Sequence, residues 1–361
     1  MRRRWKILLG ATGALLVAGL VPIVYVETSC TAPQPGLDAS GQFRSRLPNA
    51  AGRRPEAQTW LTYPEWAIVY SAEGYGRYLA AGNRPSGFSH WREIRGFWTG
   101  LCAVNRAAAA SGGSGDYKVM LYTIGLSFSA EMLVKAAYEN TIGRLAEWIG
   151  GWNSADDRYN AQLWQRYGAF MHETPWYAFP FGEALSGLWS TDGSGAQFRH
   201  WERRLALTAE YGVKAGYAGL IGWASGATLG RDERTLRFVA RADPAALPAV
   251  DRRFRPVARL GAGLIAVEAP RYAQFTELML RLSRTPVQLT EIAGNDDIFV
   301  TILQPAGAHP LPADALPMIE MPLDDRPGWR RIGVTVRVAN LLPLLRAVRA
   351  GGGEVEHVYD Y

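Results

Sequence analysis

The sequence predicts an α+β protein with a single N-terminal transmembrane helix, a tryptophan-rich, mainly helical domain and a C-terminal ferredoxin-like α/β sandwich. Three observations predict this class. Residues 7–26 carry no charge, eleven of the thirteen tryptophans fall within residues 59–230, and short strand patterns alternate with helical ones from about residue 235. We therefore expect a basic start and anchor at 1–26, a flexible tether at 27–58, a helical domain at 59–230 and an α+β domain at 235–361.

The segment 7–26 has the length and composition of a membrane-spanning helix. Twenty residues at ~1.5 Å each reach roughly 30 Å, the thickness of the hydrocarbon core. Four basic residues precede the segment within positions 2–6, and the next positive charge after it is Arg44. By the positive-inside rule, the N-terminus lies in the cytoplasm and the rest of the chain lies outside it.

A cleaved secretory signal is the alternative for this segment. Its apolar run is longer than the ~7–15 residues usual for a signal, and no A-x-A-like cleavage site follows it. We therefore favour an uncleaved anchor. Only four of the 39 basic residues are lysines, and alanine and glycine are abundant, as in proteins of GC-rich bacteria. The expected location is the bacterial inner membrane, with the bulk of the chain in the periplasm.

Composition and cysteine content restrict the function further. A net charge of +6 is small for 361 residues, and no clustered basic face or zinc-finger spacing points to a nucleic-acid partner. Cys30 lies just beyond the predicted membrane span, and Cys102 lies in an apolar helical stretch. An oxidising compartment permits a disulfide between them, although their spacing does not require one.

The tether at 27–58 is rich in proline, glycine and serine and shows no period, which is typical of a linker. In the helical domain, Thr62 and Glu65 match a capping box, and Ser89 is positioned to cap the next helix. A long helix is expected over about 117–148 and another over about 198–229. The uncharged stretch 216–230 is too short to span a membrane and fits a buried or interfacial helix better.

The C-terminal domain is expected to contain strands and helices in the order β-α-β-β-β-α-β. Strands are predicted at 264–267, 287–292, 298–303, 332–338 and 355–359, and helices at 271–284 and after Asn340. The turn at 293–296 predicts a hairpin between the second and third of these strands. This order is typical of a ferredoxin-like sandwich, a fold that hosts many functions and assigns none.

Several catalytic and ligand-binding motifs are missing from the sequence. No two of the five histidines stand at metal-ligand spacing, so no metal site is predicted. No nucleophile elbow or phosphate-binding loop is present. Residues 261–266 match a loosened dinucleotide fingerprint, but a strand pattern follows them instead of the helix that such a site needs. No cofactor is predicted.

The most informative cluster lies in the long helix. Glu131, Lys135 and Glu139 interrupt a stretch that is apolar nearly all round, and Glu210 and Lys214 repeat the Glu–Lys spacing on the later helix. Two such pairs facing each other could form one network. A solvated stripe or a structural ion pair is the simpler interpretation; a polar site in an apolar pocket is the functional one. The candidate pocket comprises Glu131, Lys135, Glu139, Tyr122, Tyr138, Arg144, Glu210 and Lys214.

Three functions are compatible with these features. The first is a non-catalytic membrane-anchored envelope protein that binds an apolar or lipid-like ligand or an unidentified protein partner. The second is an enzyme acting on lipid or envelope substrates, with Glu131 or Glu210 as general base and Lys135 stabilising negative charge. The third is an envelope scaffold that works only through protein partners.

Overall fold

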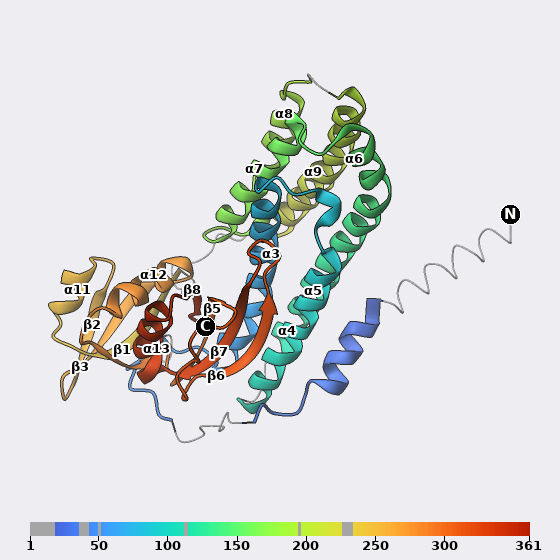
Figure 1. The fold of residues 1–361 in the computed structure, drawn as a ribbon. Helices are drawn as coiled ribbons and strands as arrows, with labels where there is room; N and C mark the ends of the chain where they lie inside the picture. Colours follow the sequence, from blue (N-terminus) through green and yellow to red (C-terminus); the bar gives the residue numbers. More distant parts are fainter. Residues whose placement is uncertain (1–18, 36–42, 50–51, 112–114, 194–195, 226–233) are drawn as a thin grey trace.

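The computed structural model describes residues 19–35, 43–49, 52–111, 115–193, 196–225 and 234–361. Within these ranges, a bundle of helices stands against two antiparallel four-stranded sheets (Figure 1). The predicted α+β class is therefore confirmed. The helices occupy the first two thirds of the chain and the sheets the last third, as the change of sequence pattern near residue 235 indicates.

The helical part opens with a helix over residues 19–29 and continues through helices of very different length. Their bounds are α2 (Gln58–Leu61), α3 (Tyr63–Ala80), η2 (Pro85–Gly87), α4 (His90–Ala110), α5 (Gly115–Tyr138), η3 (Glu139–Gly143), α6 (Arg144–Gly150), α7 (Ala155–Met171), η4 (Trp176–Ala178), α8 (Phe181–Trp189) and α9 (Gln197–Ser225). The long helix predicted at 117–148 is thus interrupted by a π-helical turn, η3.

One helix among the described residues is long and apolar enough to cross a membrane, Tyr117–Gly150. It lies in the middle of the chain, and 28% of its most apolar stretch is buried. The predicted N-terminal span is described only from residue 19, where the chain is helical; residues 7–18 lie outside the described ranges. Of the uncharged stretch at 216–230, the residues up to 225 continue α9 and the last five are not described.

The two sheets have the same strand order relative to the chain. The first contains β1 (Thr235–Arg241), β2 (Arg255–Gly261), β3 (Leu264–Pro270) and β4 (Gln288–Ile292), and the second contains β5 (Asp297–Pro305), β6 (Leu316–Pro322), β7 (Trp329–Arg337) and β8 (Glu354–Tyr359). Their orders are β2-β3-β1-β4 and β6-β7-β5-β8, and all neighbours are antiparallel. The helices between the strands are α11 (Ala246–Val250), α12 (Ala273–Leu282) and α13 (Val338–Ala350).

The predicted hairpin between 287–292 and 298–303 is wrong. β4 pairs with β1, whereas β5 pairs with β7 and β8, so the two strands belong to different sheets. Ala293 and Gly294 both have positive φ and turn the chain from one sheet to the other. Strands β1, β2 and β6 were not predicted from the sequence pattern.

The second sheet is covered on both faces. Together with the first sheet and helices α12 and α13, it encloses one apolar core that includes Phe238, Phe275 and Val300. On its other face, Phe299 and Tyr359 pack with Tyr63 at the start of α3. The helical bundle and the second sheet therefore share a core, and β5, which is buried along nearly its whole length, has the continuous apolar pattern that this position requires.

The predicted capping box at Thr62 is also wrong. α2 runs directly into α3, so Thr62 is itself helical and its hydroxyl donates to the Gln58 carbonyl oxygen. Glu65 instead accepts a hydrogen bond from the Tyr117 hydroxyl. Ser89 stands at the predicted N-cap of α4 but makes no side-chain cap. A capping box does begin α7, between Ser154 and Asp157.

The described stretches of the expected tether lie against the folded body. The backbone N–H of Gln34 donates to the Arg106 carbonyl oxygen on α4, at 3.2 Å. Leu47 is buried against the first sheet, and the N–H of Arg46 donates to the Glu291 carboxylate. The division of the chain into the four predicted regions stays a prediction.

Candidate functional site

The charged side chains predicted to pair on α5 and α9 meet in one network. Lys135 Nζ lies 2.8 Å from Glu210 Oε1 and 3.6 Å from Glu131 Oε1. Lys214 Nζ donates to Glu131 Oε2 at 2.9 Å. Residue 131 pairs with 214 and residue 135 with 210, so the two helices run antiparallel, and the spacing of four residues on each makes cations and carboxylates alternate.

A cavity of about 30 Å³ opens beside this network. Residues of α3, α5 and α7 line it together with Phe88 and His90, and many of the lining side chains are aromatic. Lys135 Nζ lies 3.8 Å from the centre of the Trp164 ring, and Lys214 Nζ lies 5.4 Å from that of Tyr167. Both ammonium groups therefore gain cation–π contacts as well as carboxylate partners. The volume is enough for one or two water molecules but far below the ~300 Å³ that a drug-sized ligand needs.

His90 is a wall residue whose two ring nitrogens both lack a hydrogen-bond partner among the described residues, and the neighbouring wall atom Trp164 Nε1 lacks one as well. His90 is 2% exposed. Burial, aided by the nearby charge of Lys135 and opposed by Glu131, lowers the pKa of His90 to about 3. The imidazole is therefore neutral at physiological pH and packs edge-on against Phe88.

Burial and the two neighbouring lysines shift the pKa of Glu131 in opposite directions. Burial alone would raise the pKa of Glu131, but Lys214 and Lys135 outweigh that effect and bring it to about 2. A carboxylate held this far below neutral pH is a weak proton acceptor. Chemically, the network fits a structural role better than that of a general base.

The other predicted pocket residues lie elsewhere on the same helix. The Tyr122 hydroxyl donates to Glu27, and the Tyr138 hydroxyl donates to Glu202. Glu139, at the start of the π-helical turn, pairs with Arg203. Arg144 donates to Asn140 Oδ1 at 3.0 Å and is exposed. The structure thus brings four of the eight residues together; their use as a functional site stays a prediction.

A second buried network at the far end of the bundle was missed by sequence reasoning. Arg203 donates to both carboxylate oxygens of Glu139, at 2.7 and 3.1 Å, and Arg199 pairs with Asp157 at 2.7 Å. The imidazole Nδ1 of His200 lies 2.5 Å from Asp156. The Arg-His-x-x-Arg-Arg sequence at 199–204 repeats its charges at helical spacing, and this pattern was the available signal.

One group of carboxylates among the described residues is close enough to hold a metal ion: Glu56, Asp296 and Asp297. Arg337 already contacts two of them, with Nη1 2.7 Å from Asp296 and Nε 3.4 Å from Asp297. Burial raises the pKa of Asp297 to about 6, although Arg337 opposes the shift. The arrangement is that of carboxylates clustered around an arginine.

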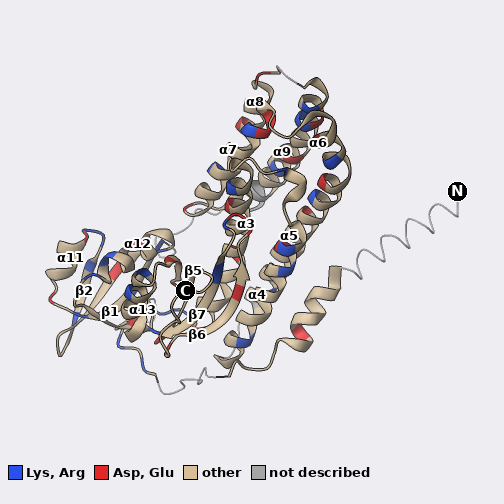
Figure 2. Ribbon diagram, in the orientation of Figure 1, with Lys and Arg blue, Asp and Glu red and all other residues tan. Residues whose placement is uncertain are grey.

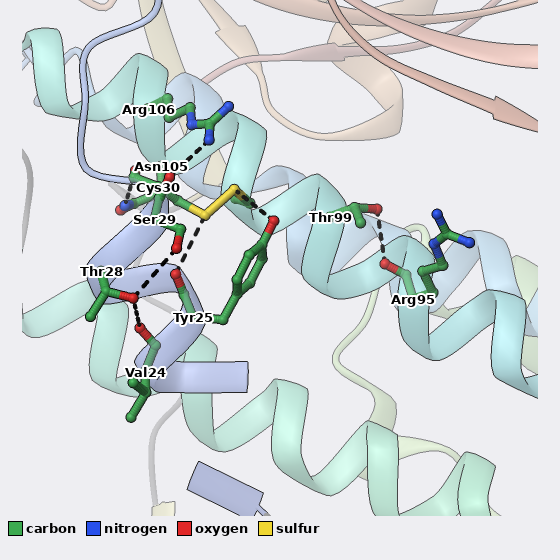
Figure 3. Close-up of a disulfide and its surroundings, with 10 residues drawn as sticks. Val24, Tyr25, Thr28, Ser29, Cys30, Arg95, Thr99, Asn105 and Arg106 are labelled. Atoms are coloured by element: carbon green, nitrogen blue, oxygen red, sulfur yellow. Dashed lines mark hydrogen bonds between the residues drawn. A yellow bond between two sulfur atoms is a disulfide. The ribbon is translucent and has the colours of Figure 1, made fainter. Parts of the chain in front are cut away.

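A disulfide joins the end of the first described helix to the bundle. Cys30 is bonded to Cys102 on α4, and Asn105 Nδ2 donates to the Cys30 carbonyl oxygen at 2.8 Å (Figure 3). The Tyr25 hydroxyl lies 3.8 Å from Cys102 Sγ. The bridge that the sequence permitted is therefore formed, and it fixes the last turn of the 19–29 helix onto α4.

Comparison of the chain with family models, curated proteins and solved structures finds no match.

Proposed function

We propose that this chain is a non-catalytic, membrane-anchored protein of the bacterial envelope, with its folded body in the periplasm. The observation that carries the proposal is the disulfide between Cys30 and Cys102. Cys30 follows the uncharged segment 7–26 by only four residues, so the bridge fastens the end of the proposed single N-terminal transmembrane helix to the bundle. The function is then to hold the body at a set position on the membrane surface.

The disulfide also supports the proposal that the body lies on the periplasmic side of the membrane. Disulfides persist in oxidising compartments such as the periplasm and are rare in the cytosol. The four basic residues before the anchor independently favour an N-terminus in the cytoplasm. Both arguments support the proposal that the body lies outside the cytoplasm.

We further propose that the C-terminal part consists of two ferredoxin-like units in tandem. Each sheet has its first and second strands on either side of its third, with the fourth beside the first, which is the order of that fold. In the second unit, an extended segment between β5 and β6 replaces the first helix. Pro256 on edge strand β2 and Pro317 on edge strand β6 disfavour the addition of a partner's strand, so these units fit a supporting role.

The catalytic alternative receives less support. It needs a proton acceptor, but Glu131 is held ionised by two lysines, and Glu210 is paired with Lys135. The cavity beside them has room for water rather than for a lipid. An apolar or lipid-like partner is therefore proposed at the surface of the bundle instead of in its interior.

Fractionation and thiol labelling of freshly opened cells test the proposal. We expect the full-length chain to stay in the membrane pellet after alkaline carbonate extraction. Because both cysteines are buried, the chain is denatured before labelling; a maleimide should then modify neither cysteine until a reductant is added, and both afterwards. Release by carbonate would contradict the anchor, and two free thiols in freshly opened cells would contradict the periplasmic location.

A further inference from the structure

The bundle has its charges on the inside and apolar side chains on part of its outside. Among the exposed side chains between Val119 and Ile149 on α5 and α6, only Arg144 is charged. On α9, no exposed side chain between residues 196 and 220 is charged. The large exposed apolar residues of these helices are Val119, Met120, Leu133, Val134, Ile142, Leu145, Trp148, Ile149, Phe198, Trp201, Leu205, Val213, Tyr217 and Leu220.

The charged residues of these helices lie mainly in the interior of the bundle. Arg199, Arg203 and Lys214 all come from α9, and each pairs with a carboxylate on α5, η3 or α7 (charges in Figure 2). Soluble helices carry the reverse pattern, with the apolar stripe inward and the charges outward. An apolar outer face backed by an ion-paired interior is suited to a hydrocarbon surrounding.

The opposite side of the bundle keeps the ordinary pattern. The exposed residues of α7 include Arg158, Gln162, Gln165 and Arg166. A bundle crossing the membrane would place these polar groups in lipid, which is costly. Only the face made by α5, α6 and α9 is therefore compatible with burial in the bilayer, with the helices lying along its surface.

The position of the anchor identifies the bilayer as the occupant of this face. The helix of residues 19–29 lies beside α4 and α5 (Figure 1), and a side chain added at Gly19 would contact Leu126 of α5. Leu20, Val21 and Val24 of this helix are exposed, which extends the apolar surface toward the anchor. The twelve residues immediately before residue 19 are uncharged in sequence, so the membrane that receives them adjoins α5.

The aromatic residues strengthen this assignment. Trp148 is 84% exposed, and Trp189 and Trp201 are about half exposed and lie edge to face 6.4 Å apart. Tryptophan is enriched where a protein meets the headgroup region, because its ring is apolar and its N–H is polar. These side chains stand near the junction of α6 with α9, at one end of the apolar face.

We propose that the outer face of α5, α6 and α9 is a second membrane-binding element, which rests in the outer half of the bilayer beside the N-terminal anchor. The proposal deepens the proposed function, since it assumes the same membrane. The bundle then lies flat, with α7 toward water and the sheets at the end of the bundle. Its partner is a lipid surface rather than a single bound lipid.

Environment-sensitive labels on single introduced cysteines test whether this face contacts lipid or water. The native cysteines are paired, so Val134→Cys, Val213→Cys or Gln162→Cys supplies the only thiol of the full-length chain. Each variant is labelled with a nitrobenzoxadiazole dye and reconstituted in phosphatidylethanolamine–phosphatidylglycerol vesicles. We expect the labels at 134 and 213 to lose most of their emission to nitroxide-bearing lipids and to resist aqueous iodide. The label at 162 on α7 should behave in the opposite way.

Each other outcome overturns the proposal. Labels at 134 and 213 that iodide quenches as strongly as the label at 162 would show a face open to water. Labels shielded from both quenchers, with cysteine cross-links between chains at 134 or 213, would show that a second copy covers the face. Carbonate extraction of the same vesicles tests the anchor separately. A chain that stays in the membrane although its labels are exposed to water would be consistent with the proposed function and would contradict only this inference.

Discussion

His90 is a buried histidine without a protein hydrogen-bond partner among the described residues, and its titration should be visible in stability. Its pKa is lowered to about 3 in the folded chain, mainly by burial, against an ordinary value of 6.5. Between these values the unfolded chain binds one more proton than the folded one. The unfolding free energy therefore keeps its full value with respect to His90 above pH 6.5, and it decreases as the pH falls from 6.5 toward 3.

We expect His90→Leu to remove about 2 kcal/mol of the difference between the unfolding free energies at pH 7 and pH 5. Chemical unfolding of the wild type and the variant at both pH values measures this difference, and subtraction cancels the other titrating groups. His309→Leu, on an exposed loop, is the matched control for removing an imidazole that is not buried. Equal pH dependence of wild type and His90→Leu would show that folding does not lower the pKa of His90.

Lys135 joins the two carboxylates of the cavity network. It contacts Glu210 and Glu131 and covers the Trp164 ring, with only 11% of its side chain exposed. Lys135→Met should lower the unfolding free energy by roughly 3 kcal/mol, because it leaves the mostly buried Glu210 without a cation. Glu131 keeps its ion pair with Lys214. Adding Glu210→Gln to this variant should cost less than it costs the wild type. Additive losses in this double-mutant cycle would contradict a coupled network.

The sequence pattern identified the charged residues of this network but not His90, which lines the cavity beside it. Glu131, Lys135, Glu210 and Lys214 could be identified because charges spaced by four residues stand out in apolar helices. His90 could not, since a lone histidine near a helix start has no distinctive pattern. Arg144 and Tyr122 were grouped with the network by proximity in sequence, but helical rotation directs them to other partners.

At the scale of elements, glycines set how closely α3 and α7 approach. A side-chain carbon at Gly76 would lie 2.7 Å from the backbone nitrogen of Gln165, so one of the two helices would have to move. We expect Gly76→Ala to lower the unfolding free energy by about 1–3 kcal/mol, the usual range for overpacking.

Gly212 on α9 offers the contrasting substitution. A side-chain carbon there would meet nothing within 4 Å, so Gly212→Ala should gain helix propensity and stabilise the chain by up to about 1 kcal/mol. Thermal unfolding of both variants in the same detergent gives the comparison. Stability changes of the same sign at the two positions would contradict this account of the contact between α3 and α7.

The misassigned elements share a cause. The turn 293–296 has hairpin composition, but the partners of β4 and β5 are strands up to 60 residues distant, which a local pattern cannot reveal. The residues at Thr62 and Glu65 match a helix start, yet α2 already supplies the preceding helical turn. Long amphipathic or apolar segments such as α5 and α9 were predictable because their signal is repeated over many turns.

At the scale of the whole molecule, the parts form one continuous body. Trp60 and Tyr63 bind the bundle to the second sheet, and the 293–296 turn joins that sheet to the first. The disulfide adds the end of the 19–29 helix to the same body. A Pro-, Gly- and Ser-rich composition predicted a flexible connection after the proposed anchor. Composition could not reveal that Cys30 would be bonded to a residue 72 positions later.

The disulfide should therefore carry much of the stability of the full-length chain. In the chain-entropy account, closing a loop with a sequence separation of 72 contributes about 4 kcal/mol by restricting the unfolded state. We expect reduction of the full-length chain, or Cys30→Ser together with Cys102→Ser, to lower its thermal unfolding temperature, measured in detergent by circular dichroism. The double variant should not respond to reductant. An unfolding temperature that reductant leaves unchanged in the wild type would contradict this account. It would mean that the buried Val26 and the hydrogen bonds of Asn105 and Arg106 hold the 19–29 helix in place without the covalent bond.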